Sequence, residues 1–189
     1  MILASKSPRR VQLLSEAGFA FEAVPADIDE RAVSAPTPGE LVLELAREKA
    51  SAVERRRAGE GEVVIGSDTV VVLDCRILGK PADAADAARM LRDLSGRSHE
   101  VLTGVCAIRD GEELFSFTER AEVEFWDLTE RQIEAYVATG EPLDKAGAYG
   151  IQGRGRMLVK GIRGDFYNVM GLPVSRLVRE LERFGITAE

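Results

Sequence analysis

The sequence predicts an α/β fold, a mixed twisted sheet with helices on both of its faces. Segments with the apolar pattern of strands alternate with segments that have the apolar periodicity of helices. No repeat, low-complexity block or linker-like stretch interrupts this alternation. Because 189 residues suffice to bury one full core, we expect residues 1–189 to form a single domain with a cleft.

The first part of the chain is predicted to hold a short strand and two helices. The strand opens the chain. The first helix begins where Ser7 can cap it and Pro8 can open it, and it ends at Gly18. The second helix begins at residues 37–40, which combine a capping box with a proline at the first helical position, and it runs through Val53.

The rest of the chain continues the alternation of strands and helices. The predicted elements are a strand over 63–73, a helix over 83–94, a hairpin of strands over 101–108 and 114–125, a helix from 129 to near 140, a strand over 157–162 and a helix from 173 to 185. The turn signal Asp110-Gly111 joins the hairpin, and Thr129 with Gln132 forms a second capping box.

Composition and charge exclude several classes of protein. Hydrophobic residues make up 45% and charged residues 30%, and no apolar run is long enough to span a membrane. Residues 1–8 have neither the charged n-region nor the apolar h-region that is typical of a signal peptide. We therefore expect a cytoplasmic protein without a membrane partner. The net charge of −7 argues against a nucleic-acid partner, because phosphate backbones are bound through basic patches.

The two cysteines and the tryptophan are assigned structural roles from the sequence. Cys75 and Cys106 lie far apart without a CxxC spacing, so we expect buried thiols and no disulfide. The single tryptophan, Trp126, is expected in the core.

The segment Ser7-Pro8-Arg9-Arg10 has the outline of a phosphate site. It places two guanidinium groups in the opening turn of a helix, whose free N–H groups already favour an anion. Taken alone, the segment fits a capped helix with two solvated arginines better.

Asp68 places a carboxylate inside an otherwise apolar strand, where burying its charge is costly without a partner. A metal ion would neutralise this charge, and Asp68 could then activate the attacking water. The alternative is that Asp68 lies at a strand end and caps the following turn.

Several other polar residues are compatible with a phosphate or metal site. Lys80 and Lys145 stand beside glycine and proline, although exposed turn lysines are the default interpretation. The acidic residues Asp27, Asp29 and Glu30 offer metal ligands, or they form a solvated loop.

A glycine-rich stretch over residues 147–155 presents one amide side chain, Gln152. That amide can read a base edge, or it can bind its own backbone. His99, the only histidine, is interpreted as structural, because no Ser/His/Asp arrangement is recognisable. The sequence has neither a P-loop motif nor a G-x-G-x-x-G motif after a strand, which excludes those two enzyme classes.

Taken together, these residues resemble the Maf family from end to end. The motifs that carry the resemblance are SKSPRR at 5–10, LAREKA at 45–50, SDTVV at 67–71, GKP at 79–81, GEPLDKAGAYGIQG at 140–153 and NVMGLP at 168–173. The resemblance implies a Maf/inosine-triphosphatase-like fold with two lobes around a cleft. It also implies a divalent cation, Mg²⁺ or Mn²⁺, a homodimer, and hydrolysis of a nucleoside triphosphate to the monophosphate and pyrophosphate.

The resemblance also assigns roles to individual positions. Asp68 matches the general base, and Glu30 an acid near the metal, so that Glu30 and Asp68 are the expected metal ligands. The matched phosphate-binding residues are Ser7, Arg10, Lys49 and Lys80, with Lys145 as an additional site. By its pattern alone, Lys49 would be a solvent-exposed helix residue.

The resemblance further indicates which nucleotides bind. Arg9, Thr69 and Gln152 match positions associated with base selection, and the form Tyr-Gly-Ile-Gln-Gly resembles the branch that acts on dTTP and UTP. The family's association with septum formation leaves an alternative, a regulator of cell division that binds a nucleotide without essential turnover. Retention of Asp68 favours the enzyme, because a pure sensor needs no general base.

Overall fold

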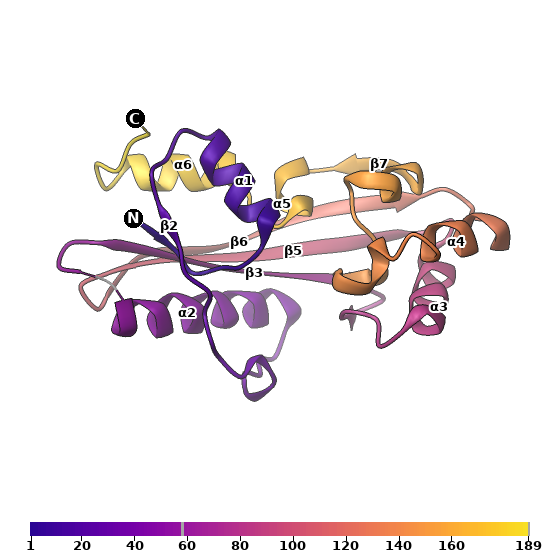
Figure 1. Ribbon diagram of the computed structural model, residues 1–189, viewed down its shortest axis with the longest axis horizontal. Coiled ribbons are helices and arrows are strands. Elements are labelled where there is room, and N and C mark those ends of the chain that lie inside the picture. The colour runs from indigo at the N-terminus through magenta and orange to yellow at the C-terminus, as the bar shows by residue number, and fades with distance from the viewer. Residues whose placement is uncertain (58, 189) are drawn as a thin grey trace. The chain divides into compact units, whose positions relative to one another are not determined.

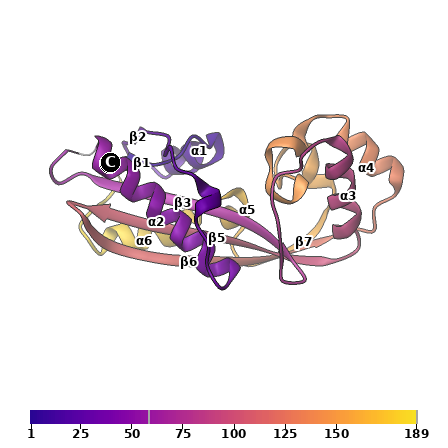
Figure 2. The same cartoon turned by 90° about the horizontal axis from the view of Figure 1, so that it is seen from below.

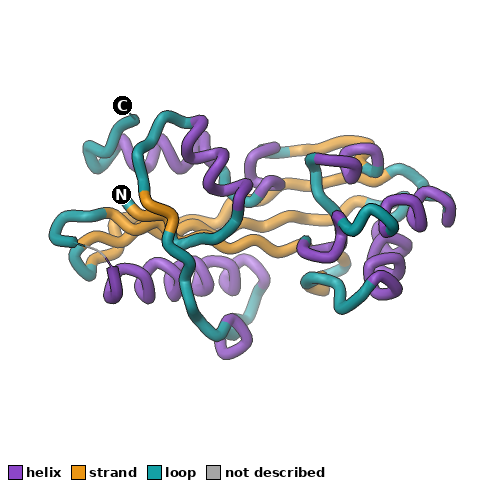
Figure 3. Tube along the Cα trace, viewed as in Figure 1, coloured by secondary structure: helices purple, strands orange, loops and turns teal. Residues whose placement is uncertain are grey.

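The computed structural model describes residues 1–57 and 59–188, and it confirms the predicted α/β class (Figure 3). The α-helices are α1 Pro8–Glu16, α2 Pro38–Arg57, α3 Ala84–Leu94, α4 Glu130–Val137, α5 Phe166–Met170 and α6 Val174–Glu182. The strands are β1 Ile2–Leu3, β2 Glu22–Ala23, β3 Val63–Leu73, β4 Arg76–Leu78, β5 Ser98–Arg109, β6 Glu112–Phe125 and β7 Val159–Arg163. Short 3₁₀ helices are η1 Glu30–Ala32, η2 Glu141–Asp144, η3 Ala146–Ala148 and η4 Gly153–Met157.

The sheet is mixed, as predicted. Its strand order is β2-β1-β3-β5-β6-β7, and β4 pairs with β3 outside this path. β1 is parallel to both β2 and β3, whereas β4 is antiparallel to β3 and β7 is antiparallel to β6. The predicted hairpin is confirmed, since β5 and β6 are neighbours joined by a turn in which Asp110 and Gly111 have φ of 52° and 80°.

The chain divides into two compact units. Unit 1 comprises Met1–Asp68, Thr103–Glu119 and Gly171–Glu189, and unit 2 comprises Thr69–Leu102 and Arg120–Met170. The strands β3, β5 and β6 each contribute residues to both units. The expectation of a single domain stays a prediction.

Unit 1 has helices on both faces of its strands. Figure 1 shows α2 along one face and α1 with α6 along the opposite face. The core beneath α2 is formed by small and β-branched side chains from the strands and the helix: Ile2, Ala4, Val24, Ala46, Ala50, Val53, Val64, Cys106 and Ile108. Small alanines on the buried face of α2 let the helix approach the strands closely.

Unit 2 packs α3 against α4, with short 3₁₀ helices beside them (Figure 2). Its core combines aliphatic residues with aromatic rings that meet edge to face. The ring centroids of Phe125 and Tyr149 lie 4.8 Å apart, and those of His99 and Tyr149 lie 5.3 Å apart. His99 is buried, which confirms its structural interpretation.

The strongest helix starts are confirmed in atomic detail. The Thr37 hydroxyl accepts from the Glu40 amide at 3.2 Å and donates to the Glu40 carboxylate at 2.7 Å. Thr129 and Gln132 form the second capping box. At α1 the expected position is right, but the side chain of Ser7 makes no capping hydrogen bond, and its amide donates to Ser5 Oγ at 3.1 Å instead.

Two predictions about burial are wrong. Trp126 is 52% exposed, because alternation along β6 points Phe125 into the core and carries the next residue outward, beside Lys160. Cys75 is exposed, since it lies in the tight turn between β3 and β4, whereas Cys106 is buried as expected. Both thiols are free. Across residues 1–57 and 59–188, no helix combines the length and apolar composition that crossing a membrane requires.

Candidate active site

The centre of the site in unit 1 is the ammonium group of Lys49. Its Nζ lies 2.6 Å from Asp68 Oδ1 and 2.7 Å from Glu30 Oε1. The side chains of Lys49 and Asp68 are 10% and 13% exposed, whereas that of Glu30 is 59% exposed. The expectation of a solvent-exposed Lys49 is therefore wrong, and the charge that Asp68 brings into the strand is neutralised by this lysine.

Asp68 lies in the middle of β3 rather than at a strand end, so the alternative of a turn-capping aspartate is wrong. The strand continues without interruption through Asp68 and Thr69, whose side chains are only partly buried within an otherwise buried run. A charged group is tolerated here because its partner comes from the neighbouring helix at hydrogen-bonding distance.

Two glycines bring α2 close enough for this contact. A Cβ built on Gly66 would lie 2.0 Å from the carbonyl oxygen of Ala46, and one built on Gly104 would lie 2.2 Å from that of Val42. Neither separation leaves room for a methyl group. The helix therefore lies nearly backbone to backbone on β3 and β5, and Lys49 projects from its buried face.

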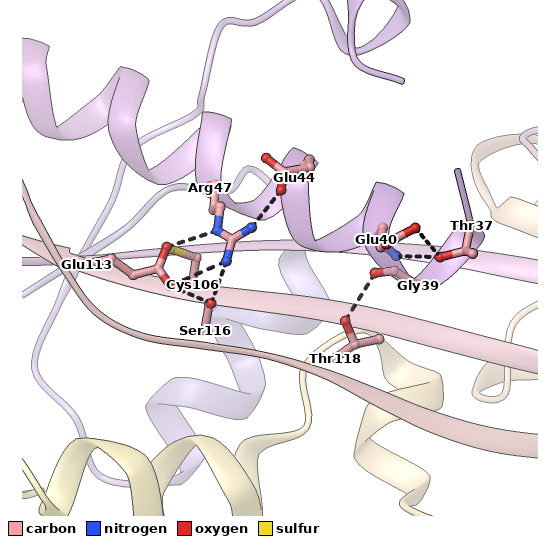
Figure 4. Close-up of polar contacts among 9 residues, drawn as sticks. All are labelled: Thr37, Gly39, Glu40, Glu44, Arg47, Cys106, Glu113, Ser116 and Thr118. Atoms are coloured by element: carbon pink, nitrogen blue, oxygen red, sulfur yellow. Dashed lines mark hydrogen bonds and ion pairs between the residues drawn. The ribbon is translucent and has the colours of Figure 1, made fainter. Parts of the chain in front are cut away.

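A polar network along the other side of α2 ties the helix to β6 (Figure 4). Arg47 donates to Glu44 at 2.6 Å, to Glu113 at 2.9 Å and to the hydroxyl of Ser116 at 3.0 Å. Hydrogen bonding from Arg47 lowers the pKa of the Glu113 carboxyl. Burial, followed by the charge of Glu113, raises the pKa of the Cys106 thiol to about 12, so that this thiol stays protonated.

Arg10 is anchored by backbone carbonyls rather than solvated. Its Nε donates to Gly171 O at 2.7 Å and its Nη1 donates to Ser67 O at 2.8 Å. Burial lowers the pKa of the Arg10 guanidinium from its ordinary value, and the charge of Asp68 opposes that effect, as does that of Glu30 more weakly. Arg9 also acts on this pKa, in the lowering direction. Arg10 is thus a fixed cation in the electrostatic environment of the Lys49 centre.

Unit 1 therefore brings together four of the predicted residues, Arg10, Glu30, Lys49 and Asp68. Arg9 precedes Arg10 on α1, and Ser7 stands at the N-cap of that helix. Of the acidic residues in this segment, Glu30 pairs with Lys49, and Asp29 caps η1 by accepting from the Arg31 amide. The sequence did not predict that the carbonyl groups of Ser67 and Gly171 hold Arg10, because any residue type can supply a backbone carbonyl acceptor.

The other predicted residues belong to unit 2. Thr69 is partly buried on β3, and Lys80 is exposed after β4. The Gly147 amide donates to Gly79 O at 3.1 Å, which joins the glycine-rich stretch to the segment that carries Lys80. Gly147 has φ of +68°, and a Cβ there would lie 2.9 Å from Val71, so both its conformation and its surroundings require glycine.

The segment that carries Gln152 is held by neighbouring side chains. The Gly150 amide donates to Tyr136 Oη at 3.1 Å, and the Arg154 amide donates to the Glu141 carboxylate. Gln152 is partly buried and makes no capping bond to the following turn. Lys145 donates to Glu141 O at 2.7 Å and to Asp144 at 2.6 Å, so its ammonium is committed to its own loop.

His99 and Tyr149 support the same segment from within the core of unit 2. His99 Nε2 and Tyr149 Oη lie 2.7 Å apart. Desolvation lowers the pKa of His99 to about 4 and raises the pKa of Tyr149 above its ordinary value, so both stay neutral near pH 7. Among the described residues, His99 Nδ1 has no hydrogen-bond partner.

The donors at the Lys49 centre fit a divalent cation. Two carboxylate oxygens already converge on one positively charged atom, at 2.6 and 2.7 Å. Within residues 1–57 and 59–188, no group of three or more His, Cys, Asp or Glu side chains could hold a metal ion. Two carboxylates suit Mg²⁺, which is commonly bound through one or two of them together with substrate phosphates.

Comparison with known proteins identifies the family of this chain. The family model described as Maf-like protein matches residues 1–184. The chain belongs to the Maf family. Maf relatives named dTTP/UTP pyrophosphatase include one from Bacillus cytotoxicus, 53% identical over 97% of this chain and 94% of that protein, and one from Bacillus cereus, 51% identical over 98% and 96%. Among solved structures, a HAM1 protein from Coxiella burnetii shares the fold, with a TM-score of 0.53 and 15% identity over 96% of this chain and 98% of that one.

Proposed function

We propose that this Maf protein is an enzyme that hydrolyses nucleoside triphosphates, dTTP and UTP in particular, to the monophosphate and pyrophosphate. The observation that carries the proposal is the Lys49 centre, where an acid in an apolar strand meets a lysine and a second acid, with Arg10 beside them. The names of relatives that are 51–53% identical over nearly their full length support the choice of nucleotides.

In the proposed reaction, Asp68 is the general base. Its carboxylate takes a proton from water as the water oxygen attacks the α-phosphorus. The bond between the α-phosphorus and the α–β bridging oxygen breaks, and pyrophosphate departs. Ser7, Arg10, Lys49 and Lys80 bind phosphate oxygens and stabilise the negative charge of the leaving group, and Lys145 is an additional candidate. Glu30 and Asp68 would hold Mg²⁺ or Mn²⁺, which supplies Lewis-acid neutralisation of the phosphate oxygens when bound.

Base selection is assigned to Arg9, Thr69 and Gln152. An amide donates and accepts at once, so Gln152 can pair with a pyrimidine edge. The supports of its segment, Tyr136 and Glu141, would limit how far the amide can move.

Three further features belong to the proposal. The two units act as one domain of residues 1–189, because three strands run through both and neither unit could complete its strands alone. The protein works as a homodimer, which light scattering during gel filtration tests. It acts in the cytoplasm, where nucleoside triphosphates are found.

The test is pyrophosphate release from a panel of nucleoside triphosphates with Mg²⁺ or Mn²⁺. We expect release from dTTP and UTP, lowered about 100-fold or more in Asp68→Asn. We expect Gln152→Ala to redistribute activity among the bases. Asp110→Asn, in an exposed turn with φ of 52° that asparagine tolerates, is the matched control and should keep native activity.

One result would overturn the proposed reaction, and another would overturn only the role of Asp68. Native protein that binds nucleotides but releases pyrophosphate from none of them would leave the nucleotide-binding regulator of septum formation as the function. Full activity in Asp68→Asn would remove Asp68 from the role of general base while leaving the reaction itself intact.

A further inference from the structure

Lys49 occupies the position that the proposed function assigns to a metal ion. Its Nζ is in direct contact with both of the expected metal ligands, at 2.6 Å from Asp68 and 2.7 Å from Glu30. An ion bound by the same two oxygens would lie against this ammonium, and two cations in contact repel strongly where water is largely excluded. The ammonium and the ion therefore compete for one place.

Lys49 is itself expected to bind phosphate. In the structure its ammonium contacts two carboxylates and not a phosphate group. Glu30 and Asp68 can hold a metal ion, and Lys49 can bind phosphate, if Lys49 leaves the two carboxylates when the ion and the nucleotide bind.

The surroundings show which cation can move. Arg10 donates to the backbone carbonyls of Ser67 and Gly171, and planar guanidinium groups held in this way are fixed in direction. Lys49 has a flexible four-carbon stem and contacts side-chain carboxylates, of which Glu30 is 59% exposed. The backbone of α2 stays in place because Gly66 and Gly104 seat it on the strands. Only the end of the lysine side chain has to move.

We propose that Lys49 is a place-holder for the divalent cation: it neutralises Glu30 and Asp68 in the free protein, leaves them when the ion binds, and then contacts a phosphate oxygen. The inference rests on the proposed role of Glu30 and Asp68 as metal ligands. It gives a binding order, in which arrival of the ion makes the phosphate-binding cation available. It also gives a reason why a buried lysine faces two acids in a site for a polyanion.

The experiment is a titration of the full-length protein with Mn²⁺ in the absence of nucleotide, followed by electron paramagnetic resonance. We expect Lys49→Met, which keeps the length of the side chain and removes its charge, to bind Mn²⁺ about tenfold more tightly than the native protein. Lys49→Arg keeps the charge and should not gain affinity. Lys160→Met is the matched control, because Lys160 also pairs with a carboxylate, Glu124, at 2.6 Å, and should bind Mn²⁺ as the native protein does.

A second measurement follows the ammonium itself in the native protein, which avoids any loss of folding in a variant. The chain has five lysines, so the ¹⁵N signals of their ammonium groups are few, and Lys49 is assigned by its absence in Lys49→Met. We expect Mg²⁺ to shift the Lys49 signal and to leave that of Lys160 unchanged.

Equal Mn²⁺ affinity in native protein and Lys49→Met, or a Lys49 signal that saturating Mg²⁺ leaves unchanged, overturns the place-holder. Loss of Mn²⁺ binding in Lys49→Met combined with Asp68→Asn supports it, since the ion then depends on the same carboxylate. These readings do not depend on turnover. A protein that releases no pyrophosphate can still show the exchange, and an active enzyme can fail to show it.

Discussion

Gly104 lies on β5 where the backbone of α2 passes too close for any side chain. In Gly104→Ala the new Cβ would lie 2.2 Å from Val42 O and 2.6 Å from Leu43 N, whereas ordinary contact begins at 3.4 Å. To relieve the clash, α2 would have to retreat by about 1.2 Å. Overpacking costs about 1–3 kcal/mol, and because both opposing atoms are backbone we expect a loss of about 3 kcal/mol.

The same displacement should reach the active site. A helix that retreats by about 1 Å displaces Lys49 relative to β3. The ammonium is then misplaced in the free protein, where it lies 2.6 Å from Asp68, and in the loaded protein, where it is proposed to contact a phosphate oxygen. We expect pyrophosphate release at 25 °C to fall by about 100-fold, in line with misplacements of this size. The melting temperature should fall by about 6–12 °C, measured by circular dichroism.

Gly39→Ala is the control on the same helix. Its Cβ would have Thr118 Cγ2 at 3.9 Å as its nearest neighbour, and alanine is favoured over glycine in a helix by up to about 1 kcal/mol. We expect native activity and an equal or higher melting temperature. A native melting temperature in Gly104→Ala would refute the close contact. A lowered melting temperature with native turnover would refute the link between the position of α2 and the site.

Three further changes test other parts of the molecule. The pKa of His99 is lowered to about 4, so between pH 6.5 and 4 only the unfolded chain gains a proton there, and the free energy of unfolding should fall by about 3 kcal/mol. In urea titrations His99→Gln should lose that part of the pH dependence, and an unchanged profile would contradict it. Thr129→Ala removes the cap of α4 and should cost about 1 kcal/mol in the same titrations, whereas an unchanged midpoint would show that the cap adds nothing. Arg47→Ala breaks a half-exposed pair and should cost about 0.5–1 kcal/mol. It should also raise the pKa of Glu113, which carbon NMR of the carboxyl group measures, and a pKa that stays low would contradict the pairing.

Elements with local signals could be predicted from the sequence because their causes lie within a few residues. The cap at Thr129 and the turn at Asp110-Gly111 are of this kind. Strand β4 was missed because the turn before it contains no glycine. Asp74 and Cys75 take φ of 50° and 62°, a conformation uncommon for residues with a side chain. The turn is held by a distant residue, Arg97, which donates to Asp74 at 2.6 and 2.7 Å.

The candidate site was predictable only in part, for a related reason. A carboxylate in an apolar strand requires a counter-charge. The sequence indicates this requirement at Asp68 but does not indicate which residue supplies the charge. The partner depends on where one helix crosses one strand. The periodicity of α2 indicates only which of its faces are apolar. A lysine is therefore predicted to be exposed even where the neighbouring strand carries an acid that can pair with it.

The small residues at the crossing of α2 and β3 determine which residue becomes the partner of Asp68. Ala46 and Ala50 face Gly66, two residues before Asp68, and Lys49 stands immediately before Ala50. A helix this close to a strand cannot admit a long side chain between them, so the lysine must extend along the strand to the first group that accepts it. Larger residues at Ala46 or Gly66 would separate helix and strand and leave Asp68 without its cation. The small residues of this crossing, which touch no substrate in the proposed mechanism, therefore determine the chemistry of the site as directly as Lys49 and Asp68 do.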